Sequence, residues 1–145
     1  MRHLVSCLCV LGLVGLWLAG CGGGYKPKQG VVVTGTVLKG GKPMEVPRQD
    51  VGFGHLEVRL VPAVGGPVST YAEKDGTFKI VGAGDGIPPG SYRLAVSLQD
   101  NGWNSDGLKG AFSDKDSPIK VEVPKEKLGG TFDLGALDLD TYKKK

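Results

Sequence analysis

The residues best suited to recognise a ligand gather in one stretch of the chain, residues 99–117, which read QDNGWNSDGLKGAFSDKDS. An indole lies there among carboxylates and amides, in the group Trp103, Asp100, Asn101, Asn104 and Asp106. A sugar ring could stack on the indole and form hydrogen bonds with the neighbouring polar groups. Such a long loop between strands is often functional. We therefore expect these five residues to contact a protein partner or a glycan.

Two other interpretations of this stretch remain open. Carboxylate and amide oxygens are also ligands of Ca²⁺, but the spacing is not that of an EF-hand. Gly102 occupies a ligand position and no glutamate closes the loop, so we predict no metal site. Alternatively, Trp103 folds back to cap the open end of the domain, while the Asp and Asn residues form turns.

The remaining polar residues do not indicate a catalytic site. Beyond residue 21 the sequence has one histidine, His55, and no serine lies in a nucleophile-elbow pattern. The glycine-rich run 82–86 is followed by Ile-Pro-Pro, which is not the helix that a phosphate-binding loop requires. We predict that the protein is not an enzyme, has no catalytic residues and uses no cofactor.

The composition favours one domain with many turns. The chain has 145 residues, of which 40% are hydrophobic, and it contains 25 glycines and 9 prolines. Glycine and proline at this frequency, placed between apolar runs, indicate short strands joined by turns. The net charge of +3 is too small to indicate a nucleic acid partner. The basic tail, residues 143–145, is expected to be solvated.

The first 20 residues are typical of a secretory signal peptide. A short basic start, Met1-Arg2-His3, precedes an uncharged apolar run from Leu4 to Leu18. This run is shorter than the roughly 20 residues that a transmembrane helix needs, and it suits the apolar region of a cleaved signal. A transmembrane anchor is therefore the weaker alternative.

The segment Leu18-Ala19-Gly20-Cys21 resembles the lipobox of bacterial lipoproteins. The resemblance implies cleavage before Cys21, diacylglycerol on its thiol and acylation of the new amino terminus. Two or three acyl chains anchor a protein stably, whereas one chain binds only marginally. We therefore expect Cys21 to bind membrane lipid and to hold the protein in the cell envelope. The alternative is an ordinary cleaved signal with a cysteine at that position by chance.

Residues 21–29 are predicted to form a flexible tether. At about 3.3 Å per residue, the eight residues after Cys21 reach at most roughly 26 Å, so the domain stays near the membrane. In Gram-negative envelopes an aspartate after the lipidated cysteine retains many lipoproteins at the inner membrane. This chain has Gly22 there, which favours the outer membrane if such sorting operates.

Apolar and polar residues alternate in short runs beyond the tether, which places every second side chain on one face of a strand. The runs are 31–38, 55–61, 71–72, 77–80, 91–98, 119–123 and 132–139. The alternation changes phase once, at Gly135-Ala136, which indicates a β-bulge. No convincing helical periodicity follows residue 21. Seven short strands separated by turn signals predict an all-β fold, a single antiparallel β-sandwich spanning residues 30–142.

Three motifs in this region resemble those of carboxypeptidase regulatory-like domains. They are Val33-x-Gly35-x-Val37 followed by a Gly-Gly-Lys-Pro turn, then Asp75-Gly76-x-Phe78, then Pro88-Pro89-Gly90-x-Tyr92-x-Leu94-x-Val96. The resemblance implies a transthyretin-like, seven-stranded sandwich. The sequence from Phe112 to Leu134 is similar to that of small lipoproteins of planctomycete bacteria. Some transthyretin-like proteins hydrolyse a purine breakdown product with several histidines, but this chain has only His55 beyond its signal.

These observations predict a lipid-anchored, extracytoplasmic β-sandwich without catalysis. One hypothesis is an accessory module that binds a protein of the envelope through a sheet edge or the 99–117 loop. The other is a glycan-binding surface module that uses Trp103.

Overall fold

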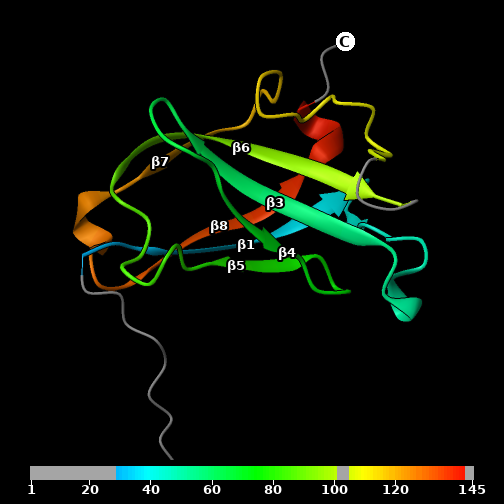
Figure 1. The fold of residues 1–145 in the computed structure, drawn as a ribbon, viewed down its shortest axis with the longest axis horizontal. Helices are drawn as coiled ribbons and strands as arrows, with labels where there is room; N and C mark the ends of the chain where they lie inside the picture. The colour runs from blue at the N-terminus through cyan, green and yellow to red at the C-terminus, as the bar shows by residue number, and fades with distance from the viewer. Residues whose placement is uncertain (1–28, 101–104, 143–145) are drawn as a thin grey trace, which may run out of the picture.

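The structure is a computed structural model that describes residues 29–100 and 105–142. These residues form two β-sheets that pack face to face, together with three short 3₁₀ helices (Figure 1). The elements are β1 (Val32–Lys39), β2 (Lys42–Pro43), η1 (Gln49–Val51), β3 (His55–Pro62), β4 (Val68–Tyr71), β5 (Thr77–Ile80), β6 (Gly90–Gln99), β7 (Lys120–Val123), η2 (Lys125–Lys127), β8 (Thr131–Asp138) and η3 (Leu139–Tyr142). The predicted all-β architecture is confirmed.

The two sheets differ in how their strands run. The β3 sheet has the order β4-β3-β6-β7, and all its neighbours are antiparallel. In the β1 sheet, β2 and β5 pair antiparallel with one edge of β1, and β8 pairs parallel with the other. The prediction of an entirely antiparallel sandwich is therefore wrong for one pair of strands. Alternation predicts which side chains share a face, but it is the same in parallel and antiparallel strands.

The predicted bulge lies in β8. Thr34 and Thr36 of β1 pair with Asp133 and Ala136 of β8, so two residues of β8 lie opposite Gly35. Gly135 has φ +68° there, a conformation that glycine adopts without the steric cost of a Cβ atom. Because the extra residue shifts the side-chain alternation, Leu137 becomes buried while Phe132 and Leu134 are only partly buried.

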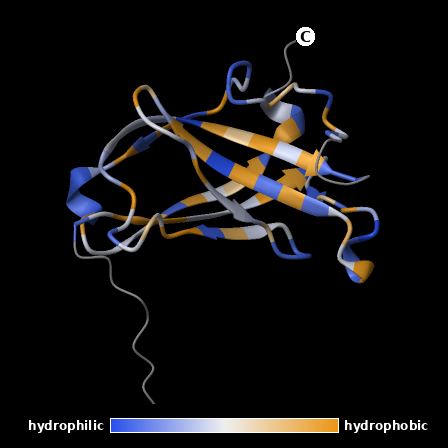
Figure 2. Ribbon diagram, viewed as in Figure 1, coloured by the Kyte–Doolittle hydropathy of each residue, from blue (hydrophilic) through white to orange (hydrophobic). Residues whose placement is uncertain are grey.

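The core lies between the sheets and is built mainly from alternating residues of the strands, together with residues outside them such as Phe112. On β3, Leu56, Val58 and Leu60 are fully buried, and they pair with Leu98, Val96 and Leu94 of β6. Figure 2 shows the corresponding alternation of apolar and polar residues along β3. No helix in the described part of the chain has the length and apolar character needed to cross a membrane.

The hairpin between β4 and β5 depends on Asp75-Gly76. Gly76 has φ +79°, and a Cβ atom there would lie 2.4 Å from the carbonyl oxygen of Val37. The Asp75 carboxylate accepts hydrogen bonds from the Thr77 hydroxyl at 2.6 Å and the Thr77 N–H at 2.9 Å. These bonds favour the ionised form and lower the pKa of Asp75. Gly76 therefore supplies the positive φ of this turn, and Phe78, two residues later, is buried in the core.

The chain enters the sandwich at one end, which we call the entry end. The Gly30 carbonyl accepts a hydrogen bond from the N–H of Gly129 at 2.8 Å, just before β8. Val31 then pairs with Ile87, shortly before β6 begins. The turns 81–89 and 124–130 therefore meet at this end, on the left in Figure 1.

The opposite end, which we call the distal end, holds a different set of loops. β3 begins there at His55, which pairs with Gln99 at the end of β6. η1 immediately precedes β3 and lies at the right in Figure 1. The fold thus separates the point where the chain enters from the loops around η1 and after β6 by the length of the strands.

Candidate functional site

The 99–117 stretch is largely built into the sandwich. Gln99 belongs to β6, and Asp106 organises the backbone that follows. The Asp106 carboxylate accepts hydrogen bonds from the N–H groups of Leu98 at 3.1 Å, Leu108 at 2.9 Å and Gly110 at 2.8 Å. Asp106 therefore shapes this segment as a turn residue, while its predicted contact with a partner stays a prediction.

The other predicted contacts divide into two groups. Asp100 is partly buried and follows β6 directly, so it lies at the distal end. Asn101, Trp103 and Asn104 lie outside the described residues, as does Cys21. Their expected roles in partner contact and lipidation stay predictions.

Residues 105–117, which we call the 105–117 segment, run along the edge of β6 beyond the end of β7. The N–H of Val96 donates to the Phe112 carbonyl at 2.9 Å, and the Ser117 hydroxyl donates to the Leu94 carbonyl at 2.5 Å. The Phe112 side chain is only 1% exposed and packs in the core. The segment therefore protects an edge of β6 that would otherwise be open.

The same segment also contacts the outer face of the β3 sheet, the face turned away from the core. The Asp114 carboxylate lies 3.0 Å from Nε of Arg59. Nη1 of Arg93 donates to the Asp114 carbonyl at 2.9 Å and to the Lys115 carbonyl at 2.6 Å. Nη1 of Arg59 also lies 3.4 Å from Oε2 of Glu57, and the same oxygen accepts a hydrogen bond from the side-chain amide of Gln99. Arg59 and Arg93 therefore hold the 105–117 segment against the outer face of the β3 sheet.

The distal end carries an exposed apolar tip that sequence analysis missed. Val51 is 60% exposed and Phe53 is 58% exposed, on the loop that contains η1. The guanidinium of Arg48 lies 4.9 Å from the centre of the Phe53 ring, a cation–π contact that orients the ring. The sequence signal was available, because Val51 and Phe53, each followed by a glycine, do not continue any strand alternation.

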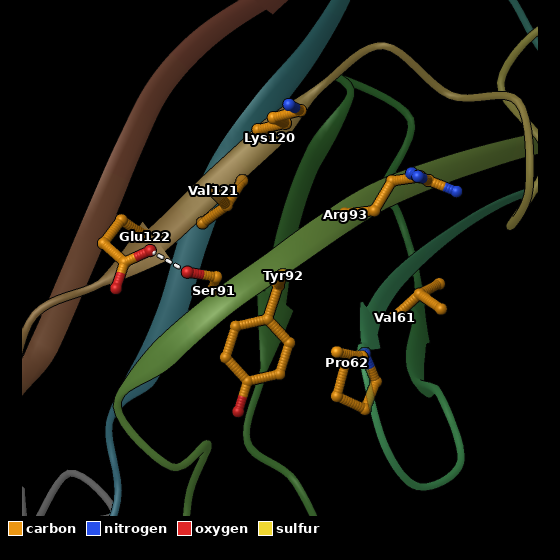
Figure 3. Close-up of a pocket in the computed structure, with 9 residues that line it drawn as sticks. Val61, Pro62, Ser91, Tyr92, Arg93, Lys120, Val121 and Glu122 are labelled. Atoms are coloured by element: carbon orange, nitrogen blue, oxygen red, sulfur yellow. Dashed lines mark hydrogen bonds between the residues drawn. The ribbon is translucent and has the colours of Figure 1, made fainter.

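A shallow groove of about 650 Å³ lies over the beginning of β6 and its neighbours β3 and β7 (Figure 3). Glu122 and Ser91 line one side and are joined by a 2.5 Å hydrogen bond from the serine hydroxyl. Arg93 and Val61 line the other side in the figure. Arg93 lies directly opposite Lys120, a pairing of like charges that is unfavourable in an isolated sheet.

Tyr92 also lines this groove, and it is anchored at its hydroxyl. The hydroxyl donates to the Pro88 carbonyl at 2.8 Å, and burial raises the pKa of Tyr92. This groove thus combines fixed charges of both signs with a rigid rim, close to the entry end.

A second groove, of about 450 Å³, lies where β4 and β5 approach each other. We call it the Tyr71 groove. Hydroxyl and charged side chains line it beside one exposed aromatic ring, in the set Thr34, Thr36, Thr70, Tyr71, Glu73, Thr77, Lys79 and Asp133. His55, the histidine considered for catalysis, contacts Tyr71 with ring centres 5.0 Å apart. No group of three His, Cys, Asp or Glu side chains suited to a metal ion occurs within residues 29–100 and 105–142.

Comparison with known proteins adds no family assignment. No model of a protein family and no curated protein matches the sequence. The resemblance to carboxypeptidase regulatory-like domains and to planctomycete lipoproteins therefore stays a prediction.

Proposed function

We propose that the protein is a lipid-anchored, extracytoplasmic, non-catalytic β-sandwich that binds a protein of the cell envelope through its distal end. The observation that carries the proposal is the exposed apolar tip at Val51 and Phe53, on the end opposite the entry of the chain. A domain held by Cys21 turns its entry end towards the membrane and its distal end away from it. Exposed apolar side chains in such a position favour contact with another protein.

The transthyretin-like arrangement is part of this proposal. Six strands lie along predicted runs, β4 overlaps the predicted run 71–72 only at Tyr71, and β2 adds two residues beside the end of β1. In this arrangement the strands provide a rigid support, and the loops at one end carry recognition. Asp100 lies at the same end as Val51 and Phe53, so it would extend the apolar tip into one surface.

A partner could also bind by adding a strand to the edge of a sheet. The edges of both sheets make this less favourable than binding at the distal end. β4 and β7 have four residues each, and β8 is interrupted by its bulge. Short and bulged edge strands offer few aligned backbone groups to an incoming strand. The 105–117 segment covers the remaining edge of β6.

A site-specific photo-crosslinker placed at position 53 in the full-length protein, in intact cells of its own source, tests the proposal. The matched control carries the crosslinker at Val64, which is 91% exposed near the opposite end. We expect one discrete envelope protein to be linked from position 53 and not from position 64, and its yield to fall in Val51→Ser. Equal labelling from both positions, or none from position 53, would contradict the proposal.

The anchor is tested separately. We expect the wild-type protein to partition into detergent and to carry acyl chains on the peptide that begins at Cys21. A Cys21→Ser variant should lose both properties while keeping its fold. A wild-type peptide of unmodified mass would refute lipidation without bearing on the distal surface.

A further inference from the structure

We propose that the Tyr71 groove is a binding site for a neutral saccharide. This site is distinct from the distal end, and the inference does not depend on the proposed protein partner. Its volume of about 450 Å³ lies within the range of roughly 300–1,000 Å³ that is usual for small-ligand sites. The groove combines an aromatic platform, a set of hydroxyl groups and an excess of negative charge.

The aromatic platform is the ring of Tyr71. The residue is 44% exposed, and its ring is supported by His55 at 5.0 Å, with the two ring planes at 39°. An exposed, supported ring is the surface on which the apolar face of a pyranose stacks, because it offers a large contact area with little loss of side-chain freedom.

The hydroxyl groups come from both sheets. Thr34 and Thr36 belong to β1, Thr70 to β4 and Thr77 to β5. The hydroxyls of Thr34 and Thr77 donate to Asp133 and Asp75, respectively. The side chains of Thr36 and Thr70 make no hydrogen bond with another described residue, so both hydroxyls can donate to and accept from sugar hydroxyls.

The charges around the groove decide which saccharide fits. Glu73 and Asp133 contribute two carboxylates and Lys79 contributes one ammonium group. The excess of negative charge repels uronic acids and other anionic sugars. The carboxylates accept hydrogen bonds from neutral sugar hydroxyls, and the ammonium group donates to them.

Nuclear magnetic resonance of the full-length protein, in a detergent without a sugar headgroup, tests the inference. The probes are maltotriose, cellotriose and chitotriose, with trigalacturonic acid as the charged comparison, each at millimolar concentration. We expect at least one neutral trisaccharide to cause saturable shifts in the amide signals of Thr36, Thr70 and Tyr71. No shift from any neutral probe, or tighter binding of the acidic probe, would overturn the inference.

Variants identify the platform. Tyr71→Ala should weaken binding about fivefold to tenfold, as expected for loss of an aromatic stack. Tyr71→Phe keeps the ring and should bind normally, and Phe53→Ala removes an exposed ring elsewhere and should have no effect. Thr36→Val keeps the side-chain shape and should weaken binding severalfold. Unchanged affinity in Tyr71→Ala, with the spectrum of a folded protein, would overturn the assignment.

Discussion

The Asp114 carboxylate lies 3.0 Å from Nε of Arg59, and this contact joins the 105–117 segment to the outer face of the β3 sheet. Both atoms are shielded from solvent, but their geometry is not that of a hydrogen bond, so the contact is an ion pair. Arg93 supports it by donating to two backbone carbonyls of the same turn. Two neighbouring strands therefore hold one turn of the segment.

We expect a small coupling energy between Arg59 and Asp114. Both side chains are partly exposed, so solvent screens their attraction, and a double-mutant cycle should give about 0.5–1 kcal/mol. The cycle uses Arg59→Gln and Asp114→Asn, with the free energy of unfolding measured in urea. The coupling should decrease as salt is added, and a value that does not change with salt would contradict this explanation.

Phe112→Ala should destabilise the fold by about 3–5 kcal/mol, because it leaves a cavity in the core. Phe53→Ala provides the matched control, since its ring is exposed, and should change stability by less than about 0.5 kcal/mol. Thermal and urea unfolding of both variants measure the difference. Similar losses in the two variants would show that Phe112 does not belong to the core.

Asp106→Ala should cost about 1–3 kcal/mol, because three backbone N–H groups lose their acceptor. The control is Glu126→Ala, which removes an exposed carboxylate from η2. Hydrogen exchange should become faster at Leu98, Leu108 and Gly110 in the Asp106 variant alone. Unchanged protection at these three amides would exclude the proposed role of Asp106 in shaping the segment.

Gly76→Ala should be more destabilising than Gly41→Ala. Both glycines have φ near +77°, at +79° and +75°, so both substitutions force an alanine into the left-handed region at about 1–2 kcal/mol. Only the Gly76 variant also places a Cβ atom against the Val37 carbonyl, whereas a Cβ at Gly41 meets nothing within 4 Å. Equal midpoints of unfolding for the two variants would contradict the close approach at Gly76.

Asp75 should contribute a pH-dependent part of the stability. Its pKa is lowered in the folded protein by the Thr77 hydroxyl and N–H, so the stabilisation is present above the ordinary value of 3.8. It is lost as the pH falls through the lowered pKa of the folded state. The stability difference between wild type and Asp75→Asn should therefore be constant at neutral pH and change only in this acidic range. A proton titration of the Asp75 carboxyl that showed a raised pKa would contradict this direction.

The strands were predictable because a strand with one buried face shows alternating apolar and polar residues in the sequence. Leu56, Val58 and Leu60 alternate with polar neighbours, and the shift of phase at Gly135 marked the bulge correctly. The direction of β8 was not predictable, because alternation carries no information on strand direction. Phe112 was not recognised as core, because the residues around it follow neither a strand nor a helix period, and its burial depends on how its segment folds back onto the sandwich.

The residues that form the candidate surfaces were harder to predict from the sequence. Tyr71 was interpreted only as part of a strand, since nothing in one strand indicates that threonines of β1 and β5 line the same groove. Asp106 was recognised as a polar residue able to bind, but its three backbone partners depend on how the segment folds. The burial of a residue could be predicted where it follows from the local alternation of a strand. A role that depends on neighbours distant in the sequence could not.

The parallel pairing of β1 with β8 also has a consequence for biosynthesis. Thr34 contacts Asp133, 99 positions later in the chain. The β1 sheet is therefore complete only after β8, the last strand to be synthesised, pairs with β1, the first. Contacts between such distant positions slow folding, because the intervening chain must first close a long loop. A nascent or truncated chain that ends before Thr131 leaves one side of β1 unpaired and exposed to other chains. Quality control should therefore distinguish full-length protein from even slightly shortened products.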